Sequence, residues 1–128
     1  MGRYLLDTHA AIWFLMGDDK LSDTARRIIG DNSNAVYVSV ASAWELAIKI
    51  GIGKLRFPGN TAGFTRMAQD NNMIILPIET AHLTVLEGLP FHHRDPFDRL
   101  IAAAAVAEKM TLITADEHIM RYGVPLVW

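Results

Sequence analysis

The chain has 128 residues, 51% of them hydrophobic and 20% charged, with no cysteine and a formal net charge of −2. This length predicts one compact domain, residues 1–128, and the composition excludes disordered, repetitive and disulfide-stapled proteins. The longest run without a charged residue, 32–44, is too short to span a bilayer, which takes about 20 residues. Asp7 interrupts the apolar residues after Arg3 before a signal peptide can form. We therefore expect a cytoplasmic protein with no membrane segment.

A net charge of −2 is unfavourable for binding nucleic acid, because phosphate contacts need lysine and arginine. If four of the 14 acidic residues were gathered in a metal site, the rest of the chain would carry 12 basic and 10 acidic residues. Net charge therefore does not exclude a nucleic-acid substrate.

Apolar runs alternate with helix-period segments, which predicts a mostly parallel sheet between layers of helices. The expected strands are 3–6, 36–40, 73–78, 111–114 and 125–128. The expected helices are 9–16, 23–29, 43–50, 61–70, 81–87, 97–109 and 117–121, with a loop rich in glycine at 51–60. In such folds ligands bind beyond the carboxyl ends of the strands, so this edge is where functional residues are expected.

Three acidic residues follow expected strands, and each also has a structural interpretation. Asp7 directly follows the first strand and can cap the next helix. Glu45 lies three residues after Ser42, a spacing that predicts a capping box. Thr114 and Glu117 form a second possible capping box, which leaves Asp116 with no structural role in it.

The stretch "HRDPFDRL" contains two further aspartates at the head of an alanine-rich helix. Asp95 followed by Pro96 predicts an N-cap with proline at the first helical position. Asp98 then takes the third helical position, where its short side chain reaches back to the cap less well than glutamate does. Its carboxylate is therefore available to point elsewhere.

Capping explains each acid separately but not why Asp7, Glu45, Asp98 and Asp116 could all converge on one edge of the sheet. Two like charges about 4 Å apart repel by about 4 kcal/mol at an effective dielectric near 20, so gathered carboxylates need a cation or must partly protonate. Ligands that are all oxygen favour Mg²⁺, with Mn²⁺ as a substitute. Ions held in this way could orient a phosphodiester and activate water.

Four segments, "YLLDTHA", "SAWELAIKIGIGKL", "HRDPFDRLIAAAA" and "LITADEHIMRY", stand in this order over nearly the whole chain. Together they resemble PIN-domain proteins of the VapC type, the ribonuclease toxins of bacterial toxin-antitoxin pairs. The resemblance implies a PIN-like three-layer α/β/α sandwich with a parallel five-stranded sheet and Mg²⁺-dependent endoribonuclease activity. It also implies a small antitoxin that covers the site, and a homodimer.

Matched to this family, the catalytic and metal-binding residues are Asp7, Glu45, Asp98 and Asp116. The resemblance implies that Thr8 and Thr114 orient these acids through their hydroxyl groups. Asp95 is an additional acid that could contribute through a water in the outer shell of the metal.

Other residues leave alternatives open. Arg94 and Arg99 flank the aspartates and could bind substrate phosphate, or could be ordinary solvated charges. The five histidines lack the paired helical spacing of a zinc site. A non-catalytic α/β domain that binds a cation or a protein is the main alternative function. An aspartyl-phosphate phosphatase is less favoured, because His9 stands where such enzymes have a second aspartate.

Overall fold

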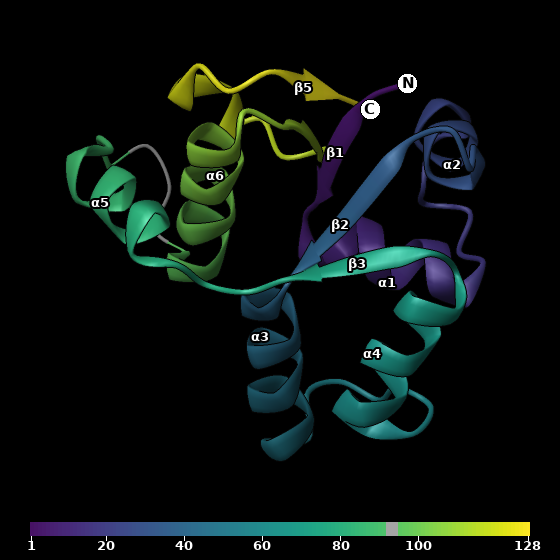
Figure 1. Cartoon of the computed structure of the whole chain (residues 1–128). Helices are drawn as coiled ribbons and strands as arrows, with labels where there is room; N and C mark the ends of the chain where they lie inside the picture. Colours follow the sequence, from purple (N-terminus) through teal and green to yellow (C-terminus); the bar gives the residue numbers. More distant parts are fainter. Residues whose placement is uncertain (92–94) are drawn as a thin grey trace.

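The computed structural model describes residues 1–91 and 95–128 of the chain (Figure 1). His92, His93 and Arg94 therefore lie outside the described residues. The strands are β1 (Arg3–Leu6), β2 (Ala35–Ser39), β3 (Met73–Leu76), β4 (Thr111–Ile113) and β5 (Leu126–Val127). The α-helices are α1 (Thr8–Met16), α2 (Asp23–Gly30), α3 (Val40–Gly51), α4 (Asn60–Asp70), α5 (Thr80–Gly88) and α6 (Pro96–Glu108).

The five strands form one sheet in the order β3-β2-β1-β4-β5, and every neighbouring pair is parallel. The carboxyl ends of the strands therefore share one edge. Helix α3 begins directly after β2, and the first turn of α6 lies at this same edge (Figure 1). The predicted parallel sheet is confirmed.

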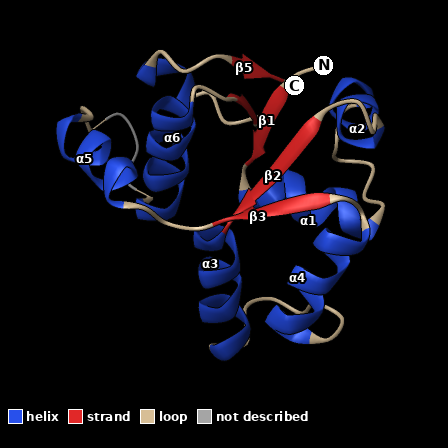
Figure 2. Ribbon diagram, in the orientation of Figure 1, coloured by secondary structure: helices blue, strands red, loops and turns tan. Residues whose placement is uncertain are grey.

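Helices cover both faces of the sheet, because successive residues of each buried strand point to opposite faces. Leu6 and Ile113 belong to the core under α1, α2 and α4. Leu5 and Leu112 belong to the second core, under α6. Figure 2 shows α5 and α6 on one side of the sheet and α1, α2 and α4 on the other. This is the expected three-layer α/β/α sandwich.

Helix α3 begins earlier than predicted. The nearly continuous apolar run 36–40 predicts that Val40 belongs to the preceding strand. In the structure Ser39 is the N-cap, and its hydroxyl accepts a hydrogen bond from the amide of Ala41 at 3.0 Å. Ser42 and Glu45 lie inside the helix, so the predicted capping box between them is wrong.

The segment after β4 also differs from the prediction. The expected helix at 117–121 is a single 3₁₀ turn, Ile119–Tyr122. The hydroxyl of Thr114 accepts from the amide of Asp116 at 3.0 Å, and Asp116 accepts from the amide of His118 at 2.9 Å. Thr114 and Glu117 therefore do not form a capping box. Within residues 1–91 and 95–128, no helix is long and apolar enough to cross a membrane.

Candidate functional site

Asp7 lies at the end of β1 and is the N-cap of α1. Its side chain is buried, and Oδ1 accepts a hydrogen bond from the amide of Ala10 at 2.7 Å. Burial raises the pKa of this carboxyl, although the hydrogen bonds from Thr114 and Ala10 act in the opposite direction. Asp7 therefore caps a helix and is also a buried acid, so its two interpretations from the sequence are compatible.

Thr114, at the end of β4, joins Asp7 to Asp116. Its hydroxyl donates to Oδ2 of Asp7 and accepts from the amide of Asp116. The negative charge of Asp116 also contributes to the raised pKa of Asp7, so these two carboxylates interact electrostatically. β1 and β4 are neighbours in the sheet, and their adjacency creates this part of the site.

Thr8 connects the first strand to α3. Its buried hydroxyl donates to Oγ of Ser42, which is fully buried, at 2.9 Å. Ser42 lies one helical turn before Glu45, so this bond ties the start of α1 to the part of α3 that carries the glutamate. From the sequence Ser42 is a predicted helix cap, and no local pattern indicates this contact with Thr8.

Glu45 is buried inside α3, with only 2% of its surface exposed. Its Oε2 atom forms a salt bridge with Nζ of Lys49, one turn further along the helix, at 2.7 Å. Its Oε1 atom is buried and has no hydrogen-bond partner among the described residues. A buried carboxylate oxygen without a partner is costly, which indicates that a further ligand belongs at this atom.

Asp95 and Asp98 lie at the start of α6. As predicted, Asp95 is the N-cap and Pro96 follows it; Oδ1 of Asp95 accepts from the amides of Phe97 at 2.8 Å and Asp98 at 3.2 Å. Asp98 is half-buried at the third helical position. The ring of Phe97 packs edge-on against Trp44 of α3, with centroids 4.9 Å apart, so the start of α6 lies beside the turn that carries Glu45.

The ammonium group of Lys49 connects the acids of α3 and α6. Its pKa is raised, first by the hydrogen bond to Glu45 and also by the negative charges of Glu45, Asp95 and Asp98. The site thus has two groups of acids. Asp7 and Asp116 interact electrostatically with each other, while Glu45 pairs with Lys49 and the negative charges of Asp95 and Asp98 also act on this lysine.

These acids share one edge of the sheet but are not packed into a closed cage. Over the described ranges, no three His, Asp or Glu side chains are close enough together to hold a metal ion. Mg²⁺ is commonly bound through one or two carboxylates while it keeps several waters, and it takes its other ligands from substrate phosphate. The set of oxygen donors and the unpaired Oε1 of Glu45 fit an ion bound in this open manner.

Arg99 lies near the start of α6, directly after Asp98. It is buried, and its guanidinium donates to the carbonyls of Pro90 at 2.8 Å and Leu89 at 3.3 Å. The same group lies 4.1 Å from the ring centroid of Phe91 and donates to the hydroxyl of Tyr122. These contacts favour a structural role that holds residues 89–91 against α6 over the phosphate contact predicted from the sequence.

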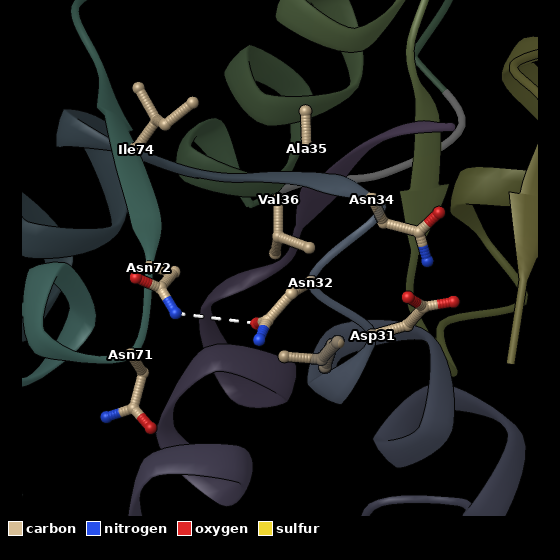
Figure 3. Close-up of a pocket in the computed structure, with 9 residues that line it drawn as sticks. Asp31, Asn32, Asn34, Ala35, Val36, Asn71, Asn72 and Ile74 are labelled. Atoms are coloured by element: carbon tan, nitrogen blue, oxygen red, sulfur yellow. Dashed lines mark hydrogen bonds between the residues drawn. The ribbon is translucent and has the colours of Figure 1, made fainter. Parts of the chain in front are cut away.

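A separate pocket lies at the opposite edge of the sheet, at the amino ends of β2 and β3 (Figure 3). Its volume is about 430 Å³, and Asp31 and four asparagines contribute to its lining. Across it, the side-chain amide of Asn72 donates to Asn32 at 3.4 Å (Figure 3). None of the predicted site residues lines this pocket.

The fold and the acids at the carboxyl edge define a class of protein, a parallel α/β/α sandwich with an open acidic site. The family model for the PIN domain matches residues 4–125, so the chain belongs to the PIN domain family. Members of this family are generally nucleases that use divalent metal ions. No curated protein matches the sequence significantly.

Solved structures with the same fold come from several bacteria. A chain of VapBC2 from Rickettsia felis, bound to a DNA fragment from its promoter, has a TM-score of 0.71 and 19% identity, covering 98% of this chain and 97% of that one. DNA-bound VapBC from Salmonella typhimurium has a TM-score of 0.71 and 19% identity, covering 99% and 98%. VapBC-1 from nontypeable Haemophilus influenzae has a TM-score of 0.69 and 18% identity, covering 98% and 96%.

Proposed function

We propose that this protein is a Mg²⁺-dependent endoribonuclease, the toxin of a toxin-antitoxin pair, and that it acts in the cytoplasm. The observation that carries the proposal is the buried Oε1 atom of Glu45, which lacks a hydrogen-bond partner in the described part of the chain. It lies in a site to which three other elements contribute acids. Membership of the PIN domain family supports the nuclease assignment.

The residues that would hold the ion are Asp7, Glu45, Asp98 and Asp116. Their oxygen donors suit Mg²⁺, with Mn²⁺ as a substitute. When bound, such an ion supplies a nucleophile at neutral pH and stabilises the negative charge of the phosphoryl group. Asp95 would contribute indirectly, because it begins the helix that presents Asp98.

The neighbouring hydroxyl groups position the acids. Thr114 holds one oxygen of Asp7, while the amide of Ala10 holds the other. Thr8 holds Ser42, which fixes α3 relative to β1. We assign both threonines this orienting role. Arg94, which lies outside the described residues, remains a proposed contact for RNA phosphate.

The proposed partner is a small antitoxin protein. Several structures that share this fold are VapBC complexes, and VapBC-5 from Mycobacterium tuberculosis belongs to a family of toxin-antitoxin systems. The test is copurification of the chain with the product of an adjacent gene that encodes a small DNA-binding protein. Loss of RNA cleavage in the purified complex is the expected result.

The chain also presents an apolar stripe along α3 and its C-cap, formed by Val40, Trp44, Ile48 and Ile52 at every fourth position. Between 37% and 61% of the surface of each of these residues is exposed. We propose that a second copy of the chain covers this stripe. A stripe of uncharged residues can pair with its own copy about a twofold axis, since no like charges meet within the stripe.

The experiment for the enzymatic proposal is cleavage of single-stranded RNA with Mg²⁺, with Mn²⁺ and with EDTA. Asp7→Asn and Asp98→Asn should each lower the rate by at least about a hundredfold, because each removes a charged ligand. Asp19→Asn, an exposed acid after α1, is the matched control and should cleave at the rate of the unsubstituted protein. Equal rates in all four proteins would show that the cleavage comes from a contaminant or from another site.

The main alternative is a domain that binds a cation or a protein without turnover. Metal binding without cleavage of any RNA would support it. Expression in growing bacteria adds a second criterion: the unsubstituted protein should arrest growth, whereas Asp98→Asn protein should not.

A further inference from the structure

Lys49 makes a contact that differs from an ordinary helix salt bridge. Glutamate and lysine four residues apart often pair on exposed helix faces, where both groups stay hydrated and the pair contributes little. Here the side chain of Glu45 is 3% exposed, while that of Lys49 is 39% exposed. The lysine therefore reaches from the surface to a buried carboxylate and places its ammonium against a proposed metal ligand.

Three carboxylates act on this one ammonium group. Nζ of Lys49 is 2.7 Å from Oε2 of Glu45, and the negative charges of Asp95 and Asp98 on α6 also act on it. The unpaired Oε1 of Glu45 lies on the same carboxylate.

We propose that Lys49 is a displaceable counter-ion, which pairs with Glu45 in the metal-free protein and moves to an RNA phosphate when a divalent ion binds to the acids. This inference rests on the proposed function. An ammonium and a divalent ion repel each other, so they compete for the oxygens of Glu45. Lysine suits such a change because it is a hydrated point charge on a flexible stem with three donors.

The role assigned to Lys49 predicts opposite effects on two affinities. Removing the ammonium should strengthen metal binding, because a competing cation is lost. It should weaken RNA binding, because a phosphate contact is lost. If the salt bridge were purely structural, its removal would strengthen neither the metal affinity nor the RNA affinity, because the site would become less rigid.

The experiment measures Mn²⁺ binding to RNA-free protein by titration, and kcat and KM for RNA cleavage. Lys49→Met keeps the aliphatic stem; we expect its Mn²⁺ affinity to rise by about tenfold and its KM for RNA to rise by a similar factor. Lys49→Arg keeps the positive charge, so we expect smaller changes in both measurements than Lys49→Met gives. Lys20→Met, at an exposed lysine after α1, is the control for a general loss of positive charge.

The outcomes separate this inference from the function on which it rests. If the unsubstituted protein binds no Mn²⁺ and cleaves no RNA, the proposed function fails and the role of Lys49 fails with it. If it binds Mn²⁺ and cleaves RNA, but Lys49→Met binds Mn²⁺ equally or more weakly, only the displaceable counter-ion is overturned. Should Lys49→Met not fold, Lys49→Gln gives the same comparison with a neutral polar side chain.

Discussion

The hydroxyl of Thr114 donates a hydrogen bond to Oδ2 of Asp7, and so joins the ends of the neighbouring strands β4 and β1. These residues are 107 positions apart in the sequence. The bond stabilises the charged form of a carboxylate whose pKa is raised by burial. It therefore connects the packing of the sheet to the ionisation of the proposed metal ligand.

Replacing Thr114 by valine keeps the shape of the side chain and removes this donor. We expect the free energy of unfolding at neutral pH to fall by about 1–3 kcal/mol, because a buried acceptor loses its hydrogen-bond donor. The pKa of Asp7 should rise further, so the acidic limb of the pH–rate profile should move to higher pH. Urea denaturation and RNA cleavage across a pH series measure the two effects. Thr114→Ser retains the hydroxyl, and an equal shift in that variant would contradict this explanation.

Asp7 itself should make the folded protein less stable as the pH rises. Burial raises its pKa in the folded state above that in the unfolded chain, so between these two values the folded protein binds more protons. Stability therefore falls with increasing pH across that window. Asp7→Asn keeps a capping side chain and cannot ionise, so we expect it to be more stable at neutral pH by on the order of 1 kcal/mol while cleavage is lost.

Urea denaturation of Asp7→Asn and of the unsubstituted protein between about pH 4 and pH 8 tests this expectation. Asp19→Asn serves as the control for loss of one negative charge at an exposed site. A decrease with pH that is equally steep in both Asp7→Asn and the unsubstituted protein would show that Asp7 is not its source.

Asp95 and Asp98 should respond differently to substitution. Asparagine caps helices about as well as aspartate, so Asp95→Asn should retain both stability and cleavage, whereas Asp95→Ala should be less stable by about 1 kcal/mol. Asp98→Asn should keep the fold and lose cleavage. Thermal unfolding and cleavage rates measured on the three variants give the comparison. An inactive Asp95→Asn protein alongside an active Asp98→Asn protein would reverse the assignment of the metal ligand.

Substitution of Arg99 can distinguish a structural role from the predicted phosphate contact. Arg99→Met leaves the carbonyls of Leu89 and Pro90 without their buried donor, so we expect a loss of about 2–4 kcal/mol in the free energy of unfolding. If Arg99 contacted RNA phosphate, Arg99→Met would instead lower the salt dependence of RNA binding by about one released ion, with little change in stability. Denaturation and RNA binding at several salt concentrations distinguish the two; Arg27→Met, at an exposed arginine of α2, is the control.

The apolar stripe on α3 predicts self-association. Replacing Ile48 and Ile52 together by glutamine should weaken dimerisation by at least about tenfold, because these two residues lose apolar contact area. Sedimentation over a range of protein concentrations measures the effect. Leu83→Gln changes a similarly exposed residue on α5 and should leave the association unchanged. If neither protein differs from the unsubstituted chain, the stripe is not the interface.

Several features of the fold could be predicted from the sequence because they depend on neighbouring residues. Apolar runs predicted all five strands to within two residues at each end, and the pair Asp95–Pro96 predicted the start of α6. The start of α3 was wrong by a few residues. Two serines near it could both cap a helix, and packing of Ala41 against the second core favours the earlier one.

The candidate site also combines features that the sequence predicts with features that only the packed fold decides. The order of strands and acids along the chain determined that Asp7, Glu45, Asp98 and Asp116 belong to one edge of a parallel sheet. Only the tertiary structure decided that Thr114 bonds Asp7, that Thr8 bonds Ser42 and that Arg99 is buried. A local sequence pattern reflects interactions among residues within one helical turn or one strand. These contacts instead join segments that meet only when the sheet and its two helical layers have packed.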